Sequence, residues 1–523
     1  MLNQTIYQLR SKANMTQEQF ANLFGVSRQS VQKWEAGEST PDIEKLVKIC
    51  KQFDVSLDAL VLGRDARETE TLPYSKQLKP QYQNMAPYET YAGALEREQT
   101  QCLEEGLDID AYAEVFKAVS ILPAGEIKEQ LGDTLFQVVL NAKQKNDYKF
   151  LEPNGLDEIK ALRKPYPLPA EYNKTMLPQK IKGAWVGRIC GCFLGKKAEG
   201  IATQKLLDFL KETGNFPMHR YLLSTDFTKE REEKYNFPTK QAFYADVIES
   251  IPADDDTNYT VLAQILIEEC GRDFTPLDVA NIWLTKQSKN AYFTAERVAY
   301  CNFIKGYLPP DSACHKNPYR EWIGAQIRGD YFGYINPGNP ELAAEMAYRD
   351  ACISHTKNGI YGEMFVAAML AAAAVTNNME QIVLAGMAQI PATCRLYKEL
   401  EKVLADYRAG LNYMDIFAKI NKDYKQYEGF ACHTIPNAMI VAAALLCGRG
   451  DYAKSICLAV QVGYDTDCNG ATVGSVVGLA QGINAIPEYW QQPTHNTLQT
   501  TIFGVGNVNI NQVAEKTLQH IKA

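Results

Sequence analysis

Two short acidic segments, far apart in the chain, limit how this sequence can fold. Asp254-Asp255-Asp256-Thr257 stands near the middle of the 523 residues, and Asp465-Thr466-Asp467-Cys468 stands near the end. Carboxylates brought into one pocket repel each other, which costs several kcal/mol unless a cation neutralises them. Hard divalent cations take oxygen ligands and keep positions open for water and substrate. A fold that joins the two segments therefore predicts a site for two divalent cations.

Each acidic segment also has a simpler explanation. The first can cap a helix, because apolar residues recur at helical spacing after it and acidic residues suit a first helical turn. The second can belong to a turn in Gly463–Gly470, before a run of small residues. Together, however, they resemble the paired signatures of the ADP-ribosylglycohydrolase family, Thr-Asp-Asp-Thr and Gly-x-Asp-Thr-Asp-Thr, which are separated by a largely helical stretch as here.

The resemblance resumes at Lys180 and runs most of the way to the C-terminus. Ile181–Gly200 resembles the family's opening helix, whose glycines permit close helix packing and which ends in a Gly-x-x-x-Glu element. Glu199 occupies the glutamate position, outside both acidic segments, and the resemblance implies that it gates the ribose site. Ile353–Gly362 resembles the family's His-containing helix at the substrate pocket. The implied substrate-binding residues are Glu199, His355, Asn358, Gly359, Tyr361 and Gly362. Without the resemblance, a solvated glutamate and a structural histidine explain Glu199 and His355 as well.

The resemblance also implies the ligands, the metals and the catalytic groups. Six side chains are expected to bind two divalent cations, with Mg²⁺ the expected metal: Asp254, Asp255, Asp256, Asp465, Asp467 and Cys468. The catalytic candidates are Glu199, Asp256 and Asp465, and which carboxylate acts as the base stays open.

Two residues and one loop depart from the family pattern. Asp254 replaces a metal-binding Thr and adds a charge, whereas Cys468 replaces a Thr and removes a hard ligand. The loop that typically cradles the diphosphate is not evident, and Tyr319–Arg328 stands roughly at its place. We expect a retained but altered metal site, and better support for the ribose end of a substrate than for the ADP end.

Residues that typically begin and end helices mark a separate unit in about the first 65 residues. Thr16–Gln19 is a capping box that opens a helix ending near Gly25, Ser27 can cap a second helix ending at Gly37, and Pro41 opens a third. The segment from Met15 to Glu38 closely resembles the lambda-repressor-like helix-turn-helix module.

In that module the second helix enters the major groove. The expected DNA-binding residues are Ser27, Arg28, Gln29, Ser30, Gln32 and Lys33. The alternative is a solvated helix face. Acidic Glu35, Glu38 and Asp42 flank these positions, so nonspecific affinity for phosphate should be modest and a homodimer is expected on DNA.

These elements predict an all-α protein in three parts. Residues 1–66 form a five-helix helix-turn-helix domain, residues 67–176 a linker and helical subdomain without an assigned function, and residues 177–523 an ADP-ribosylglycohydrolase-like helical bundle. No apolar run is long enough to span a membrane, and the N-terminus does not look like a signal peptide, so we expect a cytoplasmic protein with no membrane partner.

The sequence disfavours several other kinds of site. The 13 Cys include no CxxC pair, and we expect most of them to be reduced and packed; Cys190 and Cys192 are interpreted as packing residues, and His433 as core or pocket wall. No Walker A, GxSxG or dinucleotide-binding pattern is present.

The expected function is metal-dependent hydrolysis of a glycosidic bond at the ribose of an ADP-ribosylated or ribosyl substrate, combined with double-stranded DNA binding or transcriptional regulation. Two alternatives stay open. One is a ligand-sensing repressor that binds ADP-ribose or a riboside without turnover, and the other is an N-riboside hydrolase.

Overall fold

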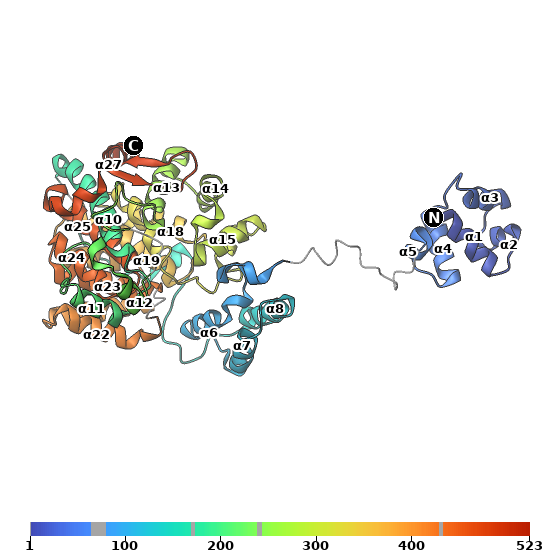
Figure 1. Ribbon diagram of the computed structural model, residues 1–523, viewed down its shortest axis with the longest axis horizontal. Coiled ribbons are helices and arrows are strands. Elements are labelled where there is room, and N and C mark those ends of the chain that lie inside the picture. The colour runs from blue at the N-terminus through green and yellow to red at the C-terminus, as the bar shows by residue number, and fades with distance from the viewer. Residues whose placement is uncertain (1, 64–79, 169–172, 238–242, 428–431, 523) are drawn as a thin grey trace. The chain divides into compact units, whose positions relative to one another are not determined.

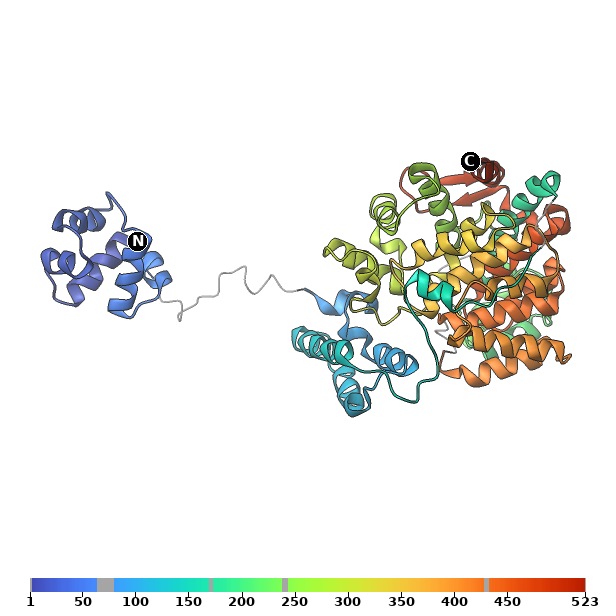
Figure 2. The same cartoon turned by 180° about the vertical axis from the view of Figure 1, so that it is seen from behind.

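The computed structural model describes residues 2–63, 80–168, 173–237, 243–427 and 432–522. The chain forms two compact units, Met1–Gln81 and Tyr82–Ala523, and both are built from helices (Figures 1 and 2). The two strands in the described residues, β1 (Thr497–Gln499) and β2 (Asn507–Asn509), form one antiparallel pair. The all-α prediction is confirmed.

The N-terminal unit contains five helices, two of which begin and end at the predicted caps. They are α1 (Leu2–Lys12), α2 (Gln17–Phe24), α3 (Arg28–Ala36), α4 (Ile43–Phe53) and α5 (Leu57–Leu62). The Thr16 side chain accepts a hydrogen bond from the Gln19 N–H, and the Gln19 side chain accepts one from the Thr16 N–H, which completes the capping box. Gly25 ends α2 in the left-handed conformation. Helix α4 differs slightly from expectation, because Asp42 rather than Pro41 caps it.

The connector that follows belongs to the second compact unit. Its helices are α6 (Leu95–Glu104), α7 (Ala113–Ser120), α8 (Glu126–Asn141) and α9 (Leu156–Ala161). Leu95, Phe116 and Leu135 contribute to a small apolar core of its own. Buried ion pairs join it to the bundle, including Glu98 with Arg320 at 3.0 Å and Glu152 with Arg395 at 2.9 Å.

The remaining helices form one large bundle around a continuous apolar core. They are α10 (Leu177–Lys196), α11 (Thr203–Glu212), α12 (Lys229–Tyr235), α13 (Asp255–Cys270), α14 (Pro276–Lys286), α15 (Thr294–Ile304), α16 (Asp311–Cys314), α17 (Asp330–Tyr334), α18 (Pro340–Ala351), α19 (Asn358–Ala373), α20 (Met379–Met387), α21 (Arg395–Arg408), α22 (Tyr413–Asp423), α23 (Thr434–Gly448), α24 (Tyr452–Val460), α25 (Thr466–Gln481), α26 (Glu488–Gln491) and α27 (Ile510–Lys522). Every residue of α19 is buried, so the helix lies in the interior.

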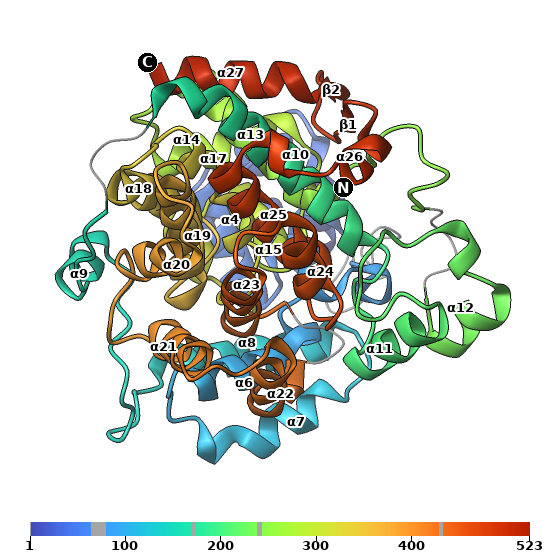
Figure 3. The ribbon, with the colours of Figure 1, turned by 90° about the vertical axis from the view of Figure 1, so that its left-hand side faces the viewer.

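Helices α10 and α25 pack backbone to backbone near the middle of the bundle (Figure 3). Glycines recur every four residues on the contacting faces: Gly183, Gly187, Gly191 and Gly195 on α10, and Gly470, Gly474 and Gly478 on α25. A Cβ atom at Gly191 would lie 2.0 Å from the Gly470 carbonyl oxygen. The same spacing sets Gly195 against Thr466, and so brings the end of α10 next to the second acidic segment.

We expect Gly191→Ala to destabilise the protein. Overpacking of a close-packed core costs about 1–3 kcal/mol, and the upper end applies here because the obstacle is a backbone carbonyl that cannot swing away. The measurement is urea unfolding. Gly125→Ala is the matched control, since a Cβ there meets only the Pro123 carbonyl oxygen at 4.0 Å, and an equal loss in both variants would contradict the role of the helix contact.

Candidate functional site

The first acidic segment begins a helix, as its simpler explanation predicts. Asp254 is the N-cap of α13, and its side chain accepts a hydrogen bond from the Asp256 N–H at 3.0 Å. Asp255 and Asp256 form the first turn, where the helix dipole favours negative charge. Capping and metal binding are therefore compatible roles for this segment.

The second acidic segment also begins a helix, α25, but without a side-chain capping hydrogen bond. Asp465 precedes the helix and Asp467 lies in its first turn. Thr466 donates a hydrogen bond to the Gly195 carbonyl oxygen at 2.7 Å, which fixes this turn against the end of α10. Two helix N-termini and one helix C-terminus thus meet at the site.

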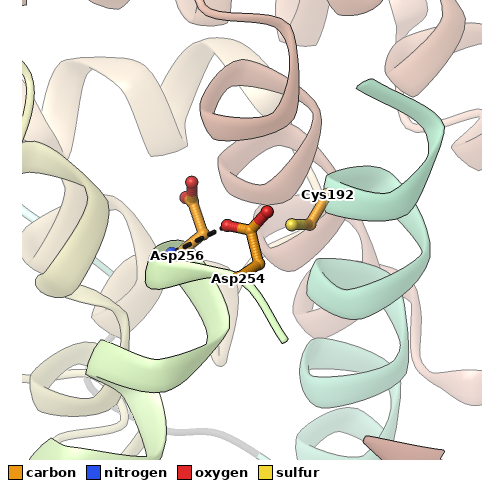
Figure 4. A group of neighbouring side chains, drawn as sticks. All are labelled: Cys192, Asp254 and Asp256. Atoms are coloured by element: carbon orange, nitrogen blue, oxygen red, sulfur yellow. Dashed lines mark hydrogen bonds between the residues drawn. The ribbon is translucent and has the colours of Figure 1, made fainter. Parts of the chain in front are cut away.

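The fold brings the two acidic segments together with α10. Potential ligand atoms lie within 4.8 Å of one another in three groups: Cys192 with Asp254 and Asp256, Asp256 with Asp467 and Cys468, and Glu199 with Asp465 and Asp467. Figure 4 shows the Asp254 carboxylate between Asp256 and the thiol of Cys192 on α10. Glu199 therefore does not stand apart from the acidic segments, as the sequence suggested, but shares a group with the second one.

Crowding shifts the ionisation of these carboxyl groups. Burial, together with repulsion from neighbouring carboxylates, raises the pKa values of Asp255 and Asp467 well above their usual range. Burial alone would also raise the pKa of Asp254, but the ion pair with Lys196 lowers it below its usual value. Desolvation and then repulsion from Asp465 raise the pKa of Glu199 to about 7. When all of them are ionised, these carboxylates outnumber the cationic side chains that the described residues pair with them.

A buried arginine holds the back of the cluster. Arg188 on α10 is fully buried, and its guanidinium pairs with Asp256 at 3.2 Å and with Asp330 at 2.9 Å. It also donates hydrogen bonds to the Thr260 hydroxyl and to the Ile327 carbonyl oxygen. These contacts orient Asp256 and link α10, α13 and the start of α17.

The donor set fits hard divalent cations. Asp256 Oδ2 is buried and has no hydrogen-bond partner in the described part of the chain, which is costly for a carboxylate oxygen unless a cation binds it. Burial raises the pKa values of the Cys192 and Cys468 thiols well above their usual range, so both favour the protonated form, which is a poor ligand. Carboxylate oxygens are therefore the main potential ligands, and they suit hard divalent cations such as Mg²⁺.

A cavity of about 510 Å³ opens onto this cluster. Of the sequence-predicted residues, it is lined by Glu199, Asp254, Asp255, Asp465, Asp467 and Cys468. Asp256 is buried and does not line the cavity. Ile323, Gly324 and Ile327, from the segment that stands in place of the expected diphosphate loop, also line the cavity.

The predicted substrate-binding residues on α19 and just before it lie elsewhere. His355, Asn358, Gly359, Tyr361 and Gly362 are buried but do not line the cavity. The Asn358 amide donates hydrogen bonds to Glu152 and Glu321, and the Tyr361 hydroxyl donates one to the Pro153 carbonyl oxygen. In this structure, Asn358 and Tyr361 fasten the bundle to the connector.

Several residues at the site were not predicted from the sequence. Lys196 pairs with Asp254 and so compensates the charge that Asp254 adds where the family has Thr. Cys192 was interpreted as packing but lies beside Asp254 and Asp256. The spacing of four between Cys192 and Lys196, which puts both on one helix face next to the Gly-x-x-x-Glu element, is a signal that could have found them. For Tyr88, which comes from the connector, we find no local signal.

The helix-turn-helix unit exposes most of its predicted DNA-binding residues. Ser27, Arg28, Gln29, Gln32 and Lys33 are exposed and Ser30 is half-buried. Val31 and Trp34 occupy the opposite, buried face of α3. Ser27 caps α3 by accepting a hydrogen bond from the Ser30 N–H, and the two hydroxyls lie 2.9 Å apart.

Comparisons with known proteins agree with this division. The profile of the ADP-ribosylglycohydrolase family matches residues 173–521, a range that contains both acidic segments, and a helix-turn-helix profile matches residues 6–60. The chain belongs to the ADP-ribosylglycohydrolase family, and its N-terminal unit is a helix-turn-helix domain. The resemblance found in the sequence is confirmed.

Curated relatives match the N-terminal unit. The chain is 43% identical over 63 residues, 12% of its length and 31% of the relative, to the HTH-type transcriptional activator BcrR of Enterococcus faecalis. It is 43% identical over 51 residues, 10% of its length and 46% of the relative, to the cryptic phage CTXphi transcriptional repressor RstR of Vibrio cholerae serotype O1. The chain thus spans less than half of the length of either relative.

Among solved structures, an ADP-ribosylglycohydrolase-related protein complex is similar over 66% of this chain and 99% of that chain, with 18% identity and a TM-score of 0.43. Within the described residues, no helix combines the length and the apolar composition that a membrane span requires.

Proposed function

We propose that the C-terminal unit is a metal-dependent glycosidase that cleaves the bond at the anomeric carbon of a ribosyl group, and that the N-terminal unit links this activity to DNA. The observation that carries the proposal is the convergence of two acidic segments and Glu199 on one cavity. Such a cavity suits a polyhydroxylated ligand that binds together with divalent cations.

The residues can share the work as follows. Two bound divalent cations, held by Asp254, Asp255, Asp256, Asp465 and Asp467, would supply positioning of the ribose hydroxyls and activation of water. Glu199 lines the cavity and shares a group with Asp465, so it is placed to take a proton from an attacking water. Carboxylate oxygens of the cluster would stabilise the positive charge that develops at the anomeric carbon.

The test is product release. Purified full-length protein is incubated with Mg²⁺ and ADP-ribosylated peptide, ADP-ribosylated DNA or simple ribosides, the last of which cover the N-riboside hydrolase alternative. We expect free ribose or ADP-ribose with at least one of them. Cys468→Thr, which restores a harder ligand, should preserve or raise the rate.

The alternative is a ligand-sensing repressor. The ion pair between Lys196 and Asp254 favours it, because a ligand position engaged by an ammonium group is less free to bind a cation. A sensor binds the ligand without releasing product, and ligand and operator then change each other's affinity by the same factor. Absence of product across the panel, together with ligand-dependent loss of operator binding, would decide for the sensor.

For DNA binding, we expect Arg28→Ala to weaken binding to an operator selected from a random DNA pool. A bidentate contact from arginine to guanine contributes about 1–3 kcal/mol of discrimination, and Arg28 is exposed at the start of α3. Fluorescence anisotropy of the full chain at constant salt measures the loss. Lys51→Ala, an exposed cation on α4, is the control and should change affinity little. Equal wild-type affinity for operator and scrambled DNA would rule out sequence specificity.

A further inference from the structure

The cavity contains a residue from outside the family domain. The family match begins at residue 173, yet Tyr88 lines the same cavity as Glu199 and Asp465. Tyr88 lies in a short 3-10 turn, Pro87–Glu89, at the start of the described connector. The connector is therefore part of the cavity wall.

Several contacts fix the Tyr88 ring in place. The neighbouring Glu89 carboxylate pairs with Lys289 at 2.5 Å and with Arg297 at 3.3 Å. The Arg297 guanidinium lies 4.8 Å from the centroid of the Tyr88 ring, and Tyr319 meets the ring edge-on with centroids 6.4 Å apart. Arg297 is itself held, because it donates a hydrogen bond to the Tyr292 carbonyl oxygen at 2.7 Å. The ring remains half-buried, so part of it is open to a ligand.

A second aromatic ring accompanies Tyr88. Phe293 also lines the cavity and is 44% exposed, and its ring centroid lies 5.8 Å from the Arg297 guanidinium. Asn290 and Thr294, which can form hydrogen bonds to the edge of a planar ring, line the cavity as well. Two aromatic faces with neighbouring amide and hydroxyl groups suit a planar heteroaromatic group.

The charges of the wall favour stacking over ionic anchoring. Among the described lining residues the cationic side chain is Lys196, and it is paired with Asp254. The carboxylates of the wall are Glu199, Asp254, Asp255, Glu296, Asp465 and Asp467. Binding energy for the part of the ligand beyond the ribose is therefore expected from aromatic contact.

We propose that Tyr88 supplies a stacking face for a planar heteroaromatic group of the ribosyl ligand, so that the connector determines specificity for that group. The inference rests on the proposed function, since it takes the ribosyl ligand from there. It also gives the connector a role: the ligand touches the part of the chain that leads, in sequence, to the helix-turn-helix unit.

Three probes that share a ribose test the proposal. Adenosine and ADP-ribose carry a planar ring and ribose does not, and binding of each to the full-length protein with Mg²⁺ is measured by calorimetry. We expect Tyr88→Ala to weaken binding of adenosine and ADP-ribose about tenfold or more, because stacking of a base on an aromatic ring accounts for a loss of this order. Ribose binding should change less than twofold, and Tyr88→Phe should bind all three probes as the wild type does.

Tyr112→Ala is the matched control, because Tyr112 is a connector tyrosine that does not line the cavity. Circular dichroism melts verify that each variant is folded. Unchanged binding of the planar probes by Tyr88→Ala would overturn the proposal, and so would an equal loss for ribose, which would indicate a structural effect. Wild-type protein that binds none of the probes would instead contradict the proposed function, and with it this inference.

Discussion

Replacing Asp467 by asparagine is expected to abolish the stabilisation that Mg²⁺ gives to the wild-type protein. Asp467 belongs to two of the three groups of ligand atoms, one with Asp256 and one with Glu199 and Asp465, so its loss weakens both. A cation that binds only the native state stabilises it by about 2.7 kcal/mol at 100 times its dissociation constant. Thermal unfolding with and without Mg²⁺ measures this increment.

Without metal, the same substitution should raise the stability of the protein. Burial and repulsion from nearby carboxylates raise the pKa of Asp467, so its charged form destabilises the metal-free native state. The metal-free asparagine variant should then be more stable than the metal-free wild type. Asp147→Asn, at an exposed turn of the connector, is the control and should leave both measurements unchanged. If no divalent cation changes the unfolding temperature of the wild-type protein, the metal site is refuted.

Replacing Arg188 by methionine is expected to destabilise the bundle strongly. Removal of one partner of a buried ion pair costs about 3–5 kcal/mol, because it leaves an uncompensated charge. Here one guanidinium serves two fully buried carboxylates, Asp256 and Asp330. Denaturant unfolding in the absence of metal measures the loss.

The double variant Arg188→Met/Asp330→Asn separates charge from packing. It removes one of the two uncompensated carboxylates and should recover part of the lost stability. Lys205→Met, at an exposed position of α11, is the control for loss of a cation alone. A double variant no more stable than Arg188→Met would show that lost packing and hydrogen bonds, not charge, dominate.

Features written in local sequence could be predicted well. The capping box at Thr16 and the left-handed glycine at Gly25 require only neighbouring residues, and the structure has both. The acidic segments were recognised because each is a compact motif, and the glycine spacing of α10 indicated close packing. The two acidic segments meet because α25 packs against α10. Local spacing did not predict this contact, and only the family resemblance suggested that the segments share a site.

Features that depend on distant packing could not be predicted. The residues of Ile353–Gly362 match a family motif, but motif identity does not determine which side of a helix faces a cavity, and here Asn358 and Tyr361 face the connector. Tyr88 reaches the cavity because Glu89 pairs with residues about 200 positions away. Such contacts follow from tertiary structure and leave no trace in spacing or composition.

The contact between α10 and α25 also sets an order in which the protein can become active during synthesis. The hydrogen bond from Thr466 to Gly195 joins residues 271 positions apart, so the acidic cluster cannot close until the segment around Thr466 has left the ribosome. The helix-turn-helix unit has its own apolar core and its own caps, and can fold long before that. A nascent or truncated chain would therefore present a folded helix-turn-helix unit before its acidic cluster has formed.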